Sequence, residues 1–149
     1  MSDLRDAITG VLNEHPGIEF HFCRPTEYEA LLEAIAERFL ARGRHDLKAT
    51  WWWTSFANET ESFVAADLFA ELRKRLHPEE SYWFVANEED GNYWVAEASG
   101  AAIFAVLRGM RDFEYYIIDR KMTWILCDSH HNTLIEARAK SQAVPLPML

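Results

Sequence analysis

The segment Phe113–Ile135 (FEYYIIDRKMTWILCDSHHNTLI) constrains the fold more than any other part of the chain. It holds three stretches rich in β-branched and aromatic residues, the composition that favours strands. The connections between them, residues 119–122 and 128–132, are short enough for hairpins. Strands joined by hairpins pair antiparallel. We therefore predict antiparallel strands at Glu114–Ile118, Thr123–Cys127 and Thr133–Ala137.

A second hairpin is predicted upstream of this segment. Ser81–Ala86 and Tyr93–Ala98 are typical strand sequences, and they flank the polar run Asn87–Asn92. Within that run, Asp90-Gly91 is a favourable turn pair. The alternation of apolar and polar residues in Ile18–Cys23 indicates one more short strand.

Apolar residues at helical spacing occupy the remaining regular segments. Thr26 followed by Glu29 forms a capping-box pattern, and Gly43 is expected to end the helix that begins there. Asn58 or Thr60 is the expected cap of the next helix. We predict helices at residues 2–14, 26–42, 58–76 and 99–110.

These elements predict an α+β fold in a single domain, residues 1–138, followed by a C-terminal tail, residues 139–149. Helices are expected to dominate the first half and to pack on one face of a mainly antiparallel C-terminal sheet. A chain of 149 residues buries enough surface to fold without disulfides or metal.

Cellular location and cofactors are inferred from what the sequence lacks. The chain has two cysteines, no signal-peptide pattern at its start, and no apolar run near the ~18 residues of a membrane span. It has no glycine-rich phosphate loop and no nucleophile elbow. We expect a cytoplasmic protein without a cofactor and without a membrane partner.

Negative charge is concentrated around the Ser81–Ala98 hairpin. The net charge is −9, and no Lys or Arg occurs between Arg75 and Arg108. This field disfavours nucleic acid and suits a basic protein partner. The alternative is an ordinary solvated loop. The predicted binding residues are Glu79, Glu80, Glu88, Glu89 and Asp90.

A polar cluster at Asp128, His130 and His131 follows the second of the three C-terminal strands. A histidine oriented by a carboxylate is a potential general base, and Cys127 lies beside them. A hydrolase or metal-dependent enzyme is therefore the alternative function. The same residues also suit a hydrogen-bonded turn, because Asp and Asn favour turns.

A structural zinc site is a further candidate. His21 and Cys23 fall on one face of a predicted strand, and Cys127 and His130 have chelating spacing. Together they supply two Cys and two His, a zinc ligand set. The spacing departs from the usual paired motifs, and cysteine is often a small buried hydrophobe.

The chain resembles a family of small, uncharacterised bacterial proteins. The shared pattern is E-Y-Y-I-h-D followed by W-h-h-C-[DE]-x-H-H-[ND], where h is hydrophobic; here it is Glu114–Asp119 and Trp124–Asn132. This resemblance implies no activity. In its small size, acidity and tryptophan content, the chain is also similar in type to immunity proteins that neutralise bacterial toxins.

The function predicted from the sequence is therefore a non-enzymatic, acidic protein-binding module, of the immunity type, for a basic toxin. A third interpretation is a homo-oligomer with Trp51–Trp53 or the tail at its interface. Trp51–Trp53 is otherwise expected to be a strand or extended segment with at least two rings in the core.

Overall fold

The computed structural model describes residues 3–47, 52–57, 60–64, 68–88, 92–110, 113–128 and 133–140. Its centre is a seven-stranded sheet in the order β1-β4-β3-β5-β6-β7-β2, and every pairing within it is antiparallel. The strands are β1 (Phe20–Phe22), β2 (Thr60–Val64), β3 (Ser81–Asn87), β4 (Tyr93–Ser99), β5 (Tyr115–Asp119), β6 (Trp124–Asp128) and β7 (Thr133–Arg138).

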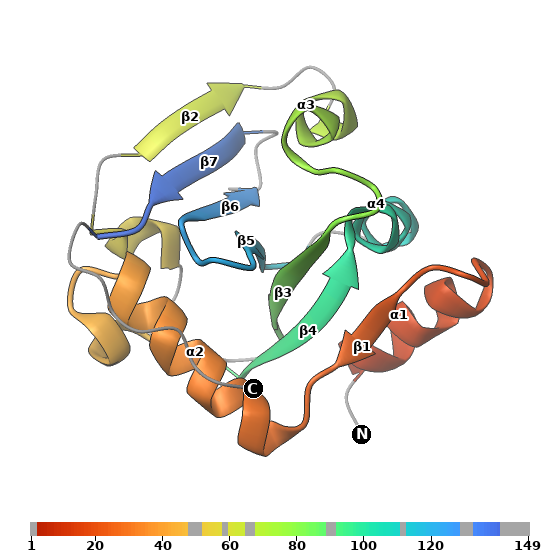
Figure 1. Ribbon diagram of the computed structural model, residues 1–149, viewed down its shortest axis with the longest axis horizontal. Coiled ribbons are helices and arrows are strands. Elements are labelled where there is room, and N and C mark those ends of the chain that lie inside the picture. Colours follow the sequence, from red (N-terminus) through yellow and green to blue (C-terminus); the bar gives the residue numbers. More distant parts are fainter. Residues whose placement is uncertain are drawn as a thin grey trace.

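Helices cover both faces of this curved sheet (Figure 1). On one side lies α2, with two short 3-10 helices; on the other lie α1, α3 and α4. The helices are α1 (Asp3–Asn13), α2 (Pro25–Phe39), η1 (Gly43–Asp46), η2 (Trp52–Ser55), α3 (Leu68–Arg75) and α4 (Gly100–Gly109).

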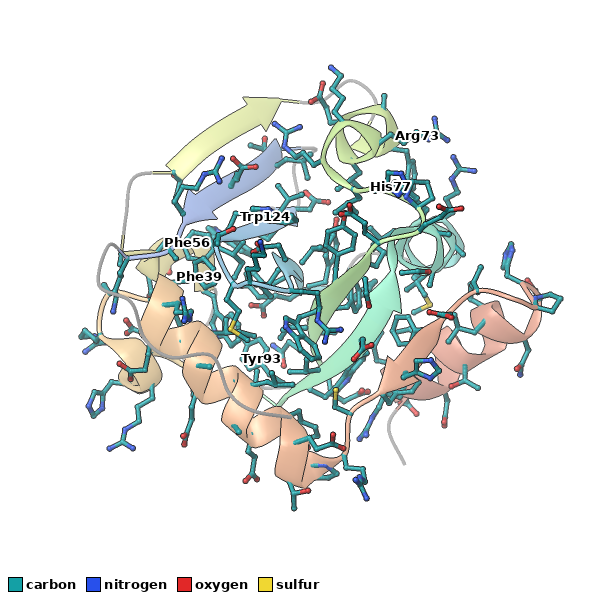
Figure 2. All side chains as sticks on the ribbon, viewed as in Figure 1. Phe39, Phe56, Arg73, His77, Tyr93 and Trp124 are labelled. Carbon is teal, nitrogen blue, oxygen red and sulfur yellow. The ribbon has the colours of Figure 1, made fainter. Side chains whose placement is uncertain are left out.

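The core beneath α2 is built from one set of alternate strand residues. Leu31, Ile35 and Phe39 of α2 are fully buried against the sheet. Phe39 and Tyr93, both labelled in Figure 2, belong to this core. The sheet contributes Trp83, Val85, Tyr93, Val95, Tyr116, Ile118, Ile125 and Cys127.

The core on the opposite face uses the other alternate residues. Phe84 and Ile117 are fully buried there, against Ile103 of α4 and Leu72 of α3. The first helix reaches this core through Ile8. Because central strands are buried on both sides, their sequences are nearly continuous apolar runs rather than alternating ones.

The α+β prediction is confirmed, but the expectation that the helices cover a single sheet face is wrong. β3 and β5 carry large apolar side chains on both faces, so one helical layer would leave half of these side chains in water. The second half of the chain supplies its own cover in α4, which begins where the sequence predicts a helix and whose N-cap Ser99 accepts a hydrogen bond from the backbone N–H of Ala102.

The predicted helix at residues 58–76 is wrong in its first half. Thr60–Val64 forms the edge strand β2, which pairs with β7 along its whole length, and the helix covers only Leu68–Arg75. The helical spacing of apolar residues through this region coincides with a sequence rich in strand formers. Pairing with β7, some distance along the chain, decides the outcome.

Two further local predictions are corrected. Trp52–Ser55 is a 3-10 helix and not a strand, and Trp51 lies outside the described residues. The cap of α2 is Arg24, not Thr26, and the carboxylate of Glu27 accepts the Arg24 backbone N–H at 3.3 Å. That helix ends at Phe39, before Gly43 is reached.

The first residues of the predicted tail are hydrogen-bonded to the rest of the domain. The backbone N–H of Ala139 donates to Thr123, and that of Lys140 donates to Arg38. The rest of the tail lies outside the described residues. Among the residues that are described, every helix is too short or too polar to traverse a bilayer.

Candidate functional site

The predicted Asp128/His130/His131 cluster is described only at its start. Asp128 ends β6 and is half-buried, whereas both histidines lie outside the described residues. Cys127 is fully buried in the core beneath α2, so Asp128, its neighbour on the strand, faces the opposite side. Burial, then the nearby carboxylates of Asp128 and Glu114, raises the pKa of the Cys127 thiol well above its usual value. A buried, protonated thiol is a poor nucleophile.

The predicted zinc site is not formed by its two cysteines. Cys23 follows β1 at one edge of the sheet, and three strands separate β1 from β6, which carries Cys127. At about 4.8 Å per strand, β1 and β6 lie roughly 19 Å apart along the sheet, which keeps the two cysteines apart. Burial, with Glu27 and Glu97, raises the pKa of Cys23 to about 11, which disfavours a thiolate ligand. His21 is exposed on β1, and within the described residues no three metal-binding side chains converge.

The predicted acidic binding residues that the structure describes, Glu79, Glu80 and Glu88, do not form one surface. Glu79 and Glu80 precede β3 and are exposed, whereas Glu88 follows the far end of that strand. The seven residues of β3 separate the two groups by roughly 20 Å. Glu89 and Asp90 lie outside the described residues.

Glu88 has a structural role instead. Its carboxylate accepts hydrogen bonds from the Leu4 backbone N–H at 2.8 Å and from the Trp94 indole N–H at 3.0 Å. Arg5 lies 3.9 Å from the same carboxylate, whose side chain is only 15% exposed. A carboxylate on free N–H groups at a helix start satisfies them and complements the helix dipole. Through these hydrogen bonds, Glu88 connects the start of α1 to the β3–β4 hairpin.

We expect Glu88→Ala to lower the free energy of unfolding by about 1–2 kcal/mol, the usual cost of losing a helix cap. The loss arises because Leu4 and Trp94 lose their acceptor. Urea unfolding followed by tryptophan fluorescence measures it. Glu14→Ala, at an exposed position near the end of α1, is the matched control and should change stability little. Equal stability of the Glu88 and Glu14 variants would contradict the capping role.

A buried carboxylate, Glu114, lies at the same end of the sheet. Glu114 is 5% exposed and accepts hydrogen bonds from the Tyr93 hydroxyl at 2.8 Å and the Asn87 amide at 3.0 Å. The Tyr116 hydroxyl also donates to Glu114, and it accepts the backbone N–H of Trp52 at 2.9 Å. Side chains from the β3–β4 hairpin and from β5, and a backbone N–H from η2, are thereby joined around one buried carboxylate.

The rings around Glu114 close this network. Trp52 is fully buried, and its ring centroid lies 4.7 Å from that of Tyr116 and 4.3 Å from that of Tyr93. Burial, and next the charge of Glu114, raises the pKa of both tyrosines, so their hydroxyls remain protonated donors. The network is internally satisfied, and we assign it to stability. The sequence predicted Glu114 only as part of a strand and a motif; a carboxylate at the start of a buried apolar strand was the signal that could have indicated this role.

A pocket of about 720 Å³ lies at the opposite end of the strands. The end of α3, the start of β3, the β5–β6 turn and the start of β6 form its walls. Trp124, labelled in Figure 2, is one of its lining residues. Glu80 lines it too, beside Arg75 and Arg120, so this carboxylate belongs to a mixed-charge pocket rather than to an acidic surface. This pocket was not predicted from the sequence, because its walls come from segments that are far apart along the chain.

A ridge of carboxylates runs along the outer face of α2. Glu29, Glu33 and Glu37 are exposed and spaced four residues apart, so they line up on one side of the helix. We call these three residues the α2 ridge. At about 1.5 Å rise per residue, the ridge is roughly 12 Å long. None of the exposed positions of α2, all of which the structure describes, is Lys or Arg.

Comparison with known proteins identifies the family. A family model described as "Family of unknown function (DUF6756)" matches residues 1–144. No curated protein and no solved structure gives a significant match. The prediction of an uncharacterised family is thus confirmed at that level. The match covers nearly the whole chain, which therefore belongs to DUF6756, a family of unknown function.

Proposed function

We propose that this protein is a non-enzymatic binding module that presents the α2 ridge to a basic protein partner. The observation that carries the proposal is the uncompensated alignment of Glu29, Glu33 and Glu37 on the solvent face of α2. Glu29 and Glu33 form no hydrogen bond or ion pair with any described side chain. Glu37 accepts only the backbone N–H of Arg44, at 3.1 Å, among its described contacts.

The ridge lowers the stability of the helix that carries it. Like charges four residues apart destabilise a helix by about 0.2–0.5 kcal/mol per pair. Glu37 also lies in the last turn of α2, where a negative charge opposes the helix dipole. An arrangement that weakens its own helix is better explained by binding than by folding. Buried Cys127, with its protonated thiol, gives no support to the alternative enzymatic function.

The expected partner is a basic protein, because opposite charges speed association and select the partner. A net charge of −9 adds a long-range field of the same sign as the ridge and repels nucleic acid. The similarity in type to immunity proteins suggests a basic toxin as that partner, bound in the bacterial cytoplasm. In this proposal the ridge replaces the scattered Glu79/Glu80 and Glu88 groups as the docking surface.

A capture experiment tests the proposal. The wild-type protein and the Glu29→Lys/Glu33→Lys variant are immobilised and exposed to a lysate of the organism that encodes the chain. We expect the wild type to retain a basic protein that elutes as salt rises, because salt screens exposed charges. The ridge variant should not retain it. Both substituted side chains are exposed, so the fold should be unaffected.

The matched control is Glu14→Lys/Glu19→Lys. It makes the same change in net charge at two exposed positions outside α2. This variant should retain the partner nearly as well as the wild type does. Loss of the partner from both variants would mean that net charge alone drives binding. Equal retention by the ridge variant, or no retained basic protein, would contradict the proposal.

A further inference from the structure

The pocket beside Trp124 has a rigid aromatic wall. Tyr82 is 3% exposed, and its hydroxyl accepts the His77 backbone N–H at 2.8 Å and donates to Glu80 at 3.3 Å. The half-buried ring of Trp124 lies 5.9 Å from the Tyr82 ring, between centroids. Both residues line the pocket. Two adjacent aromatic rings at the edge of a cavity offer a planar ligand a surface on which to stack.

The pocket carboxylates are already satisfied within the protein. Asp119 accepts the backbone N–H and the hydroxyl of Thr123, both at 2.6 Å, and the backbone N–H of Trp124 at 3.0 Å. These bonds hold the β5–β6 turn. The carboxylate of Glu80 accepts the Tyr82 hydroxyl described above. A cationic ligand would have to compete with these bonds.

The two pocket arginines are also engaged. Arg75 forms ion pairs with Glu71 at 3.1 Å and with Glu136 at 3.5 Å. Arg120 forms an ion pair with Glu97 at 3.0 Å and lies 4.2 Å above the centre of the Trp83 ring.

Lys121 differs from both arginines. It lines the pocket from the β5–β6 turn, is exposed, and has no ion pair with any residue the structure describes. Among the charged side chains that line the pocket, Lys121 alone has neither an ion pair nor a hydrogen bond with any residue the structure describes, and it lies beside an aromatic wall.

We propose that this pocket binds a small aromatic monoanion. Its ring would stack against Trp124, and its carboxylate would pair with the ammonium group of Lys121. A volume of about 720 Å³ is in the range of pockets for small organic ligands. A positive group together with an aromatic face selects for both the charge and the planarity of the ligand. This site lies away from the α2 ridge, uses none of its residues, and does not depend on the function proposed for it.

Calorimetric titration with 2-naphthoate tests this site. We expect saturable binding at one site per chain, and binding about tenfold weaker for Lys121→Gln, the scale of a lost charge-assisted hydrogen bond. Lys121 is exposed, so this variant should fold. Trp124→Leu should weaken binding similarly. Lys140→Gln, at a lysine that does not line the pocket, is the matched control and should bind like the wild type.

Two related probes separate charge from shape. The neutral amide 2-naphthamide keeps the ring and should bind about tenfold more weakly than 2-naphthoate. Cyclohexanecarboxylate keeps the charge without the aromatic face and should also bind more weakly. No saturable binding of 2-naphthoate, or equal binding by wild type and Lys121→Gln, would overturn the proposal. Failure here leaves the α2 ridge unaffected, because the two experiments use different variants and probes.

Discussion

Replacing Glu114 with alanine is expected to lower the free energy of unfolding by about 3–5 kcal/mol. The substitution leaves the hydroxyls of Tyr93 and Tyr116 and the amide of Asn87 without their common acceptor inside the protein. Each buried donor left unsatisfied costs about 1–3 kcal/mol, and the costs within one network are not simply additive. Urea unfolding followed by tryptophan fluorescence measures the loss.

Two variants make the Glu114 result specific. Glu114→Gln keeps an acceptor oxygen and should lose less stability than Glu114→Ala. Glu33→Ala removes an exposed carboxylate and should change stability by less than about 0.5 kcal/mol. A Glu114→Ala protein as stable as Glu33→Ala would show that the buried network does not hold the domain together.

The second large effect is expected at Trp52. Trp52→Ala should destabilise the protein by about 3–5 kcal/mol, the usual loss for a buried aromatic side chain. The indole is fully buried between Tyr93 and Tyr116, and its N–H donates to the Leu47 carbonyl at 3.1 Å. Urea unfolding followed by far-ultraviolet circular dichroism measures the loss without relying on the fluorescence of the ring removed.

The neighbouring tryptophan is the natural comparison for Trp52. Trp53 is only half-buried and packs at the margin of the core beneath α2, so Trp53→Ala should cost clearly less. Losses of equal size would contradict the assignment of Trp52 as the ring that anchors η2 to the sheet.

Local sequence patterns predicted the elements whose contacts are local. The hairpins formed by β3 with β4, by β5 with β6, and by β6 with β7 follow from apolar strands joined by short polar turns. The start of α4 follows from Ser99, which caps its own helix. In each case, the information lies within a few residues of the element.

Elements stabilised by distant partners were predicted less well. Thr60–Val64 has a pattern compatible with a helix, and its strand state is set by pairing with Thr133–Ala137. Residues 68–76 have the apolar spacing of a helix and form one up to Arg75. The second helical layer was missed for a related reason: continuous apolar strands do not reveal how many faces are covered.

The roles of the candidate site residues were also hard to predict from the sequence, because their partners are distant along the chain. Glu88 and Glu114 are both carboxylates near strand ends, and charge patterns alone suggest that each is exposed. Their actual roles depend on donors far along the chain: Leu4 for Glu88, and Asn87 and Tyr93 for Glu114. The α2 ridge could have been identified from the sequence, because Glu29, Glu33 and Glu37 repeat every fourth residue.

If the α2 ridge receives a basic protein, the rate at which the two proteins associate must depend on the ridge carboxylates. Stopped-flow mixing at low salt measures the rate at which the captured partner associates with each of three proteins. These are the wild type, the ridge variant Glu29→Lys/Glu33→Lys and the control Glu14→Lys/Glu19→Lys. We expect an association rate roughly tenfold or more lower for the ridge variant and a much smaller change for the control, because electrostatic steering is strongest where the opposite charges meet. Equal rates for the two variants would contradict this role of the ridge.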